Sequence, residues 1–162
     1  TTNAVWEWIG NLVVKVEHRA EFVREYNGVK YYNDSIASSP TRTALGTLSL
    51  YDEKIIIIAG GYDKHIPYEP LGPVINNKVK VLILLGDTAP KIEKAVVEAD
   101  NYNENEITII NVTNMEEAVE AAVNHAEKGD IVSLSPASAS FGLYKNFEER
   151  GNHFKAIVNA LK

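Results

Sequence analysis

Cysteine is absent from the 162-residue sequence, which excludes a disulfide framework and any metal site built on thiolates. The longest apolar runs, KIIIIAGG and KVLILLGD, are far shorter than the roughly 18–20 residues that a membrane-spanning helix needs. The first residues also lack the charged and then apolar order of a secretion signal. These absences fit the reducing cytosol, so we expect a cytoplasmic protein that does not enter a membrane.

Two common phosphate-binding motifs are missing as well. No stretch matches G-x-x-x-x-G-K-[ST], and no G-x-G-x-x-G follows an apolar run. We therefore expect neither a triphosphate site held by this chain alone nor a standard dinucleotide domain. The net charge of −6 argues against broad binding of nucleic acid, although a few local cations would suffice to hold a small anion.

What the sequence does contain is a regular alternation of apolar runs and amphipathic stretches. Continuous apolar runs predict four buried strands, at residues 54–59, 79–85, 107–112 and 131–134. Strands of this kind that alternate with helices form a parallel sheet covered on both faces. Asn27-Gly28, between two alternating runs, predicts a hairpin over residues 21–34 at the sheet edge. The expected fold is a Rossmann-like, doubly wound α/β domain with a mostly parallel sheet.

Two helix starts carry local signals. Ser39 followed by Pro40 predicts a helix that begins there, with serine as the cap and proline in the first turn. The predicted apolar face of that helix consists of Ala44, Leu45 and Leu48. Thr113 and Glu116 have the spacing of a capping box, which predicts a second helix start.

In open α/β sheets, ligands bind beyond the carboxyl ends of the strands. Four loops occupy that position in the predicted fold: NDSIASSP, AGGYDKH, LGDTAP and SPASASFG. In the second of them, Gly60 and Gly61 allow close backbone approach, and Lys64 supplies a positive charge. Lys64 is a candidate for holding a carboxylate or phosphate, and the alternative is a lysine that pairs with Asp63 or is solvated.

The serine loop offers Ser135, Ser138 and Ser140 shortly before a predicted helix. Hydroxyls and unpaired amides at a helix N-terminus suit an oxyanion, but the same serines would also cap a tight turn. No histidine and acid accompany them in an arrangement that activates a nucleophile. We therefore expect binding rather than covalent chemistry.

Polar residues near the hairpin allow two interpretations. Asp34 could accept hydrogen bonds from ribose hydroxyls or cap a turn. Arg19 could stack on a base or bind phosphate, whereas the simpler interpretation makes His18 and Arg19 a surface pair.

Five segments, in order and spacing, resemble the C-terminal domain of the Mur ligases: EHRAEFV, GVKYYNDSIAS, GGYDK, GDIVSLSPASASF and YKNFEERGNHF. The resemblance runs from about Val16 to Lys162. The D-N-P-R motif of the diaminopimelate- and lysine-adding relatives is missing, so the resemblance favours the branch that adds D-glutamate. It implies a junction or linker at residues 1–15 and an amino-acid-presenting domain at residues 16–162, cut from a longer protein.

The family resemblance implies an ATP-dependent acid–amino-acid ligase of peptidoglycan synthesis. In such an enzyme, phosphate passes from ATP to the carboxylate of UDP-N-acetylmuramoyl-L-alanine, and the amine of D-glutamate attacks the acyl phosphate. Most contacts to ATP and Mg²⁺ are expected from a central domain that this chain lacks, so the isolated domain is expected to be inactive.

The resemblance also implies roles for individual residues. D-glutamate would be bound by Ser38, Lys64, Ser140 and Phe147, and the nucleotide would be contacted by Arg19 and Asp34. No catalytic or metal-binding residue is expected in this domain. Two positions depart from the family pattern: Ile36 stands where many relatives have a lysine, and Ser138 stands where a cysteine is common. Two alternatives remain open, namely a free-standing Rossmann-like module that binds a small anion or partner without catalysis, and another ligase of the superfamily such as a folylpolyglutamate synthase.

Overall fold

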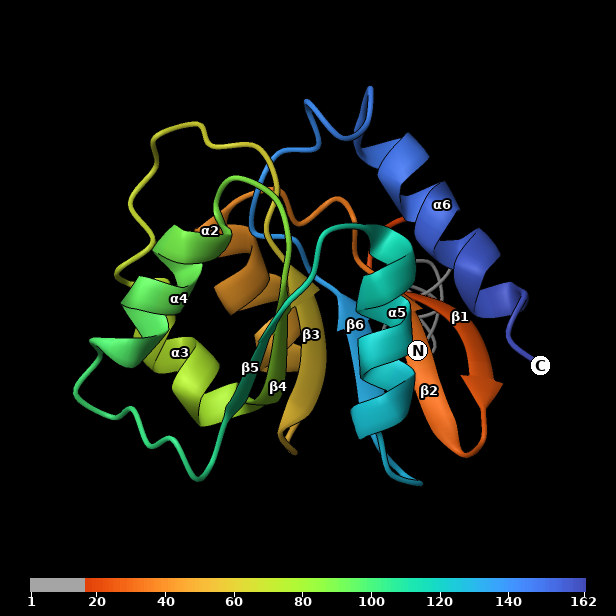
Figure 1. The fold of residues 1–162 in the computed structure, drawn as a ribbon, viewed down its shortest axis with the longest axis horizontal. Helices are drawn as coiled ribbons and strands as arrows, with labels where there is room; N and C mark the ends of the chain where they lie inside the picture. Colours follow the sequence, from red (N-terminus) through yellow and green to blue (C-terminus); the bar gives the residue numbers. More distant parts are fainter. Residues whose placement is uncertain (1–16) are drawn as a thin grey trace, which may run out of the picture.

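The computed structural model of the chain describes residues 17–162 (Figure 1). The predicted linker at residues 1–15 lies outside the described residues. Within the described part of the chain, no helix combines the length and the apolar character that crossing a membrane would require.

A six-stranded sheet forms the centre of the domain. Its strands are β1 (Glu21–Tyr26), β2 (Val29–Asn33), β3 (Ile55–Ala59), β4 (Val79–Leu84), β5 (Thr108–Asn111) and β6 (Ile131–Leu134). They lie in the order β1-β2-β6-β3-β4-β5. The β1–β2 hairpin is antiparallel and every other pair is parallel, which confirms the predicted sheet with a hairpin at its edge.

The helices cover both faces of this sheet (Figure 1). They are α2 (Pro40–Arg42), α3 (Leu71–Lys78), α4 (Ala89–Val97), α5 (Met115–His125) and α6 (Phe147–Asn159). Helices α3 and α4 pack on one face, and α5 and α6 pack on the other. The doubly wound arrangement predicted from the alternating pattern is therefore confirmed.

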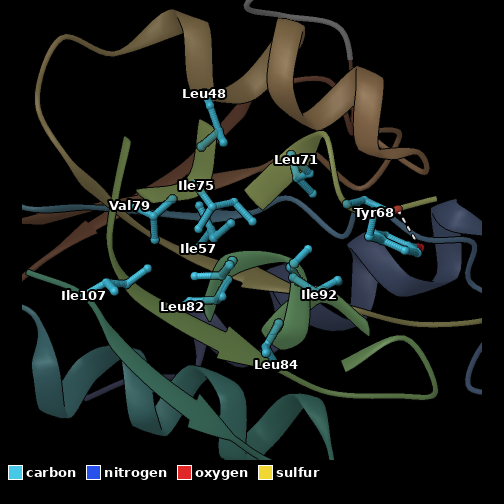
Figure 2. Packing of buried hydrophobic residues seen from close by; sticks show 14 of the residues in the cluster. Leu48, Ile57, Tyr68, Leu71, Ile75, Val79, Leu82, Leu84, Ile92 and Ile107 are labelled. Atoms are coloured by element: carbon cyan, nitrogen blue, oxygen red, sulfur yellow. Dashed lines mark hydrogen bonds between the residues drawn. The ribbon is translucent and has the colours of Figure 1, made fainter. Parts of the chain in front are cut away.

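Strand β3 explains why two separate cores form. Successive side chains of a strand point to opposite faces, and all five residues of β3 are buried. Ile57 packs with Ile75 and Ile92 of α3 and α4 (Figure 2). Ile56 and Ile58, which point to the opposite face, pack instead with residues of α5 and α6. A continuous apolar run thus supplies both cores at once, as a parallel strand covered on both sides must.

Two local predictions need correction. Ser39 does cap α2, because its side chain accepts from Arg42 N at 3.3 Å, but the regular helix ends at Arg42. A π-helical turn (Thr43–Thr47) and a 3₁₀ turn (Leu48–Leu50) follow, and they leave the predicted core residue Leu45 74% exposed. The cap of α5 is Asn114 rather than Thr113: its side chain accepts from Glu117 N at 2.8 Å. The capping motif therefore lies one residue later than predicted.

Candidate functional site

The loops that follow β2, β3, β4 and β6 gather at the carboxyl-terminal end of the strands (Figure 1). Backbone hydrogen bonds join them to one another. Ala137 N donates to Ala37 O at 2.8 Å, Gly60 N donates to Pro136 O at 2.8 Å, and Thr88 N donates to Gly61 O at 3.1 Å. The four loops therefore form one continuous rim at the carboxyl ends of the parallel strands, where ligands bind in open α/β sheets.

Lys64 and Ser140 lie on neighbouring segments of this rim. Tyr62 and Ala139 form an antiparallel bridge, in which Tyr62 N donates to Ala139 O at 2.9 Å. Lys64 follows Tyr62 closely and is exposed, whereas Ser140 follows Ala139 and is only 7% exposed. The two predicted substrate-binding residues are thus on the same rim, on loops that touch.

Of the two alternatives to a ligand-binding role for Lys64, the pairing with Asp63 is absent and the solvated side chain is what the structure shows. Asp63 pairs instead with Lys91 of α4, at 2.6 Å. Within residues 17–162 the Lys64 ammonium forms no ion pair, so its charge faces solvent at the rim. An exposed cation without an acidic partner suits the binding of an anionic ligand.

The serines of the loop after β6 divide into two kinds. Ser135 and Ser138 are buried, and their hydroxyls bond to other side chains: Ser135 to Ser133 at 2.9 Å, and Ser138 to Tyr68 at 2.7 Å. These two serve the turn itself. Ser140 differs, because it lines a small hollow of the rim together with both loop glycines and Arg150. The serine loop also ends well before the helix, since α6 begins only at Phe147.

Arg150 is the central polar residue of the rim, and the sequence interpretation missed it. The side chain is 3% exposed. Its guanidinium donates to the backbone oxygens of Ser35 at 2.7 Å and Ser138 at 2.8 Å, and to the hydroxyl of Ser38 at 3.2 Å. Burial lowers the pKa of Arg150 to about 10. One buried cation therefore ties α6 to two of the rim loops.

Phe147 joins the same network through its main chain. The Ser35 hydroxyl donates to the Phe147 carbonyl oxygen at 2.6 Å and accepts from Arg150 Nε at 3.0 Å. Ser38 lies at the other end of this loop, with its hydroxyl 3.4 Å from Ser35 O. The predicted residues Ser38 and Phe147 are thus brought together with Ser140 around Arg150. A signal was present in the sequence, because Arg150 occupies the apolar stripe of α6 between Phe147 and Phe154.

The two predicted nucleotide-contacting residues lie beside each other in a separate hollow. Its volume is about 440 Å³, and Arg19, Asp34 and Ile36 contribute to its lining together with Arg42 and Leu45. The lining is largely apolar, with cations at its margin. Ile36 lines this hollow and makes it more apolar than a lysine at that position would.

Asp34 already serves the fold on both carboxylate oxygens. Oδ1 accepts from Ala20 N at 3.1 Å, and Oδ2 accepts from the Thr47 hydroxyl. Burial raises the pKa of Asp34, and both hydrogen bonds oppose that shift. The turn-capping role is therefore real, and each oxygen retains acceptor capacity toward a ligand hydroxyl.

His18 and Arg19 do not form a surface pair. Arg19 is exposed, but His18 is only 4% exposed, with its Nδ1 2.9 Å from Asn33 Nδ2. The His18 ring also packs edge-on against Phe147. His18 is thus a structural residue of the rim, and of these two residues Arg19 is the one that a ligand can reach.

Comparison with known proteins finds relatives along most of the chain. Residues 18–138 match the family model described as Mur ligase, glutamate ligase domain. The chain is 60% identical over 149 residues to the UDP-N-acetylmuramoylalanine–D-glutamate ligase of Acetivibrio thermocellus, covering 91% of this chain and 32% of the relative. It is 59% identical over 146 residues to the enzyme of that name from Clostridium botulinum strain Hall, covering 90% of this chain and 32% of the relative. The chain thus spans about a third of the length of these relatives.

A solved structure shares the fold at much lower identity. Mycobacterium tuberculosis folylpolyglutamate synthase, complexed with ADP and AMPPCP, has a TM-score of 0.57 and 9% identity, covering 88% of this chain and 32% of that chain. This likeness concerns the fold alone.

Proposed function

The chain belongs to the Mur ligase family, and we propose that it is the C-terminal domain of an ATP-dependent ligase that adds D-glutamate to UDP-N-acetylmuramoyl-L-alanine. In this proposal residues 16–162 present the amino acid, and residues 1–15 lead to the rest of the enzyme. The product would be a precursor of peptidoglycan. The identity of 60% to a relative named for this reaction favours it over a folylpolyglutamate synthase, whose likeness is one of fold.

The observation that carries the proposal is the contact between the two loops of Lys64 and Ser140. The bridge between Tyr62 and Ala139 sets these loops side by side at the carboxyl-terminal end of the strands. An exposed ammonium on one loop and a serine hydroxyl on the loop that touches it suit a small molecule with two carboxylates. D-glutamate has this chemistry.

Each residue has a distinct task in the proposed site. Lys64 binds one carboxylate of D-glutamate through its ammonium. Ser140 and the main chain of Phe147 hold the distal carboxylate, and Ser38 contacts the amino acid from the loop after β2. The buried guanidinium of Arg150 holds these segments together, because it bonds to the loop after β6 at Ser138 and to the loop after β2 at Ser38.

The nucleotide would bind in the 440 Å³ hollow that Arg19 and Asp34 line. Arg19 lies at its exposed margin and would contact phosphate, and Asp34 would accept from a ribose hydroxyl. Among residues 17–162 no group of three or more His, Asp or Glu side chains is arranged to hold a metal ion. In this proposal the Mg²⁺ site and the phosphate-binding loop that activation needs belong to the remainder of the enzyme.

The chemistry of this domain is then mainly positioning. The amine of D-glutamate must approach the acyl phosphate of the other substrate, and correct orientation contributes up to roughly 7–11 kcal/mol to such reactions. Two carboxylate contacts fix the amino acid on both sides of its amine. Closure of the domain over the nucleotide would also exclude water from the acyl phosphate.

The proposal is tested by measuring incorporation of labelled D-glutamate into UDP-N-acetylmuramoyl-L-alanine, together with ADP release. The full-length protein that contains this chain should carry out both, and this chain alone should carry out neither. L-glutamate and D-aspartate serve as controls for stereochemistry and length. Incorporation of another amino acid in preference to D-glutamate would refute the proposed substrate, and ATP hydrolysis by this chain alone would refute the division of labour.

A further inference from the structure

The loop between β3 and α3 is anchored at both ends. At its start, Tyr62 N donates to Ala139 O at 2.9 Å. At its end, the Tyr68 hydroxyl bonds to the Ser138 hydroxyl at 2.7 Å. Between these anchors the backbone of residues 63–67 forms no backbone–backbone hydrogen bond within the described chain. The direction in which this middle segment runs therefore depends on side chains.

One carboxylate organises the middle segment. Asp63 Oδ1 accepts from His65 N at 2.7 Å, and Oδ2 accepts from Lys91 Nζ at 2.6 Å. The hydrogen bond from Lys91, followed by that from His65, lowers the pKa of Asp63. His65 has a φ of +60°, a left-handed conformation that the Asp63 turn supports. Lys64 lies between these two residues, so the Asp63 carboxylate defines the backbone on both sides of it.

Lys91 occupies a place where helix electrostatics alone would not favour a lysine. It lies in the first turn of α4, where the helix dipole favours acidic side chains. Its ammonium is instead offset by Asp63, which lies in the loop between β3 and α3. Lys94, one turn later on the same helix, lines the same hollow as Lys91 and does not pair with Asp63 in the described chain. A residue that breaks a local preference in favour of a specific partner is a candidate for a functional role.

We propose that Lys91, acting through Asp63, is a positioning residue that fixes the approach of Lys64 to the carboxylate of the amino acid. This inference rests on the proposed function. Lys91 itself does not contact the substrate, because its ammonium is committed to Asp63. The pair instead replaces the backbone hydrogen bonds that the segment lacks, and it holds Lys64 in one direction before the amino acid arrives.

The test uses steady-state kinetics of the full-length protein with five variants: Lys91→Met, Asp63→Asn, the double variant, Lys91→Arg, and Lys94→Met as the matched control. Each of the first two should raise the KM for D-glutamate roughly two- to fivefold, the range expected for an exposed ion pair, with kcat and the KM for ATP unchanged. The double variant should be no worse than either single variant, because both remove the same pair. Lys91→Arg should restore the wild-type KM, and Lys94→Met should not change it.

The outcomes separate this inference from the function on which it rests. If the full-length protein incorporates D-glutamate and Lys91→Met leaves its KM unchanged, the inference is overturned and the function stands. If Asp63→Asn lowers the KM while Lys91→Met raises it, Lys91 binds the substrate directly and the positioning role is wrong. If the full-length protein does not incorporate D-glutamate, both fall together.

Discussion

Replacing Arg150 with methionine should destabilise this chain far more than an ordinary surface substitution. The variant removes the guanidinium that donates to the backbone oxygens of Ser35 and Ser138. Ser138 O then loses this bond and Ser35 O keeps only the longer bond from the Ser38 hydroxyl, and a buried carbonyl left unpaired costs about 1–3 kcal/mol. Part of this loss is offset because the buried charge no longer has to be desolvated, the effect that lowers the pKa of Arg150 to about 10. We therefore expect a net loss of about 3 kcal/mol in the free energy of unfolding.

Urea unfolding of the 162-residue chain, followed by circular dichroism, measures this loss directly. In a thermal scan the same change corresponds to a decrease in Tm of about 6–12 °C for a domain of this size. Arg150→Lys should recover little of it, since an ammonium cannot reproduce the planar fork that reaches two loops.

Arg24→Met provides a matched control. Arg24 also donates to carbonyl oxygens of the α6 end, those of Val158 at 3.0 Å and Leu161 at 2.8 Å, but it is only partly buried. Water can replace those bonds, so the control should lose less than about 1 kcal/mol. If Arg150→Met falls within about 0.5 kcal/mol of the wild type, or loses no more than Arg24→Met, Arg150 does not hold the rim together.

Three further outcomes follow from the structure. Gly60→Ala should destabilise the chain by more than about 2 kcal/mol in urea, because Gly60 has a φ of +109° and an added Cβ would lie 1.9 Å from Leu85 O. Gly129→Ala, at a φ of +96° with nothing within 4 Å of the added Cβ, should lose only about 1 kcal/mol; equal losses would contradict the steric argument. Asp34→Asn should gain stability relative to the wild type as the pH rises above about 4 in urea titrations. Burial raises the pKa of Asp34 above its ordinary 3.8, so the wild type loses stability relative to the variant until the pH has passed the folded-state pKa, and a parallel pH dependence of both proteins would contradict this reasoning. Arg19→Ala in the full-length protein should raise the KM for ATP and leave that for D-glutamate unchanged; the reverse pattern would remove its assigned role.

The sheet was predictable because its signal is local and strong. A run such as Ile55–Ala59 is apolar at every position, and only a strand covered on both faces buries all of it. Asn27 and Gly28 likewise specify the hairpin turn through their own backbone preferences, with φ values of +52° and +78°. In these cases the physical cause lies within a few residues of the feature.

Predictions failed where the fold depends on more than the local pattern of apolar residues. Leu45 belongs to an apolar pattern, yet it is exposed, because the helix gives way to a π-helical turn after Arg42. His18 is buried because Phe147 of α6 and Asn33 of β2 pack against it. Sequence spacing does not contain these encounters.

The candidate site shows the same division. Lys64 and Ser140 could be selected because each follows a predicted strand, and the rule for open sheets then brings them to one edge. Arg150 was missed because its partners Ser35 and Ser138 lie on loops that only the folded sheet brings together. The pairing of Asp63 with Lys91, rather than with its neighbour Lys64, also depends on where α4 packs.

The most direct test of the central claim is the kinetics of Lys64→Ala in the full-length protein. The claim is that the rim loops hold a dicarboxylic amino acid between Lys64 and Ser140. The KM for D-glutamate should then rise at least about tenfold, as expected for the loss of a charge-assisted contact, while the KM for ATP changes less than about twofold. Equal changes in both constants, or an unchanged KM for D-glutamate, would contradict the claim.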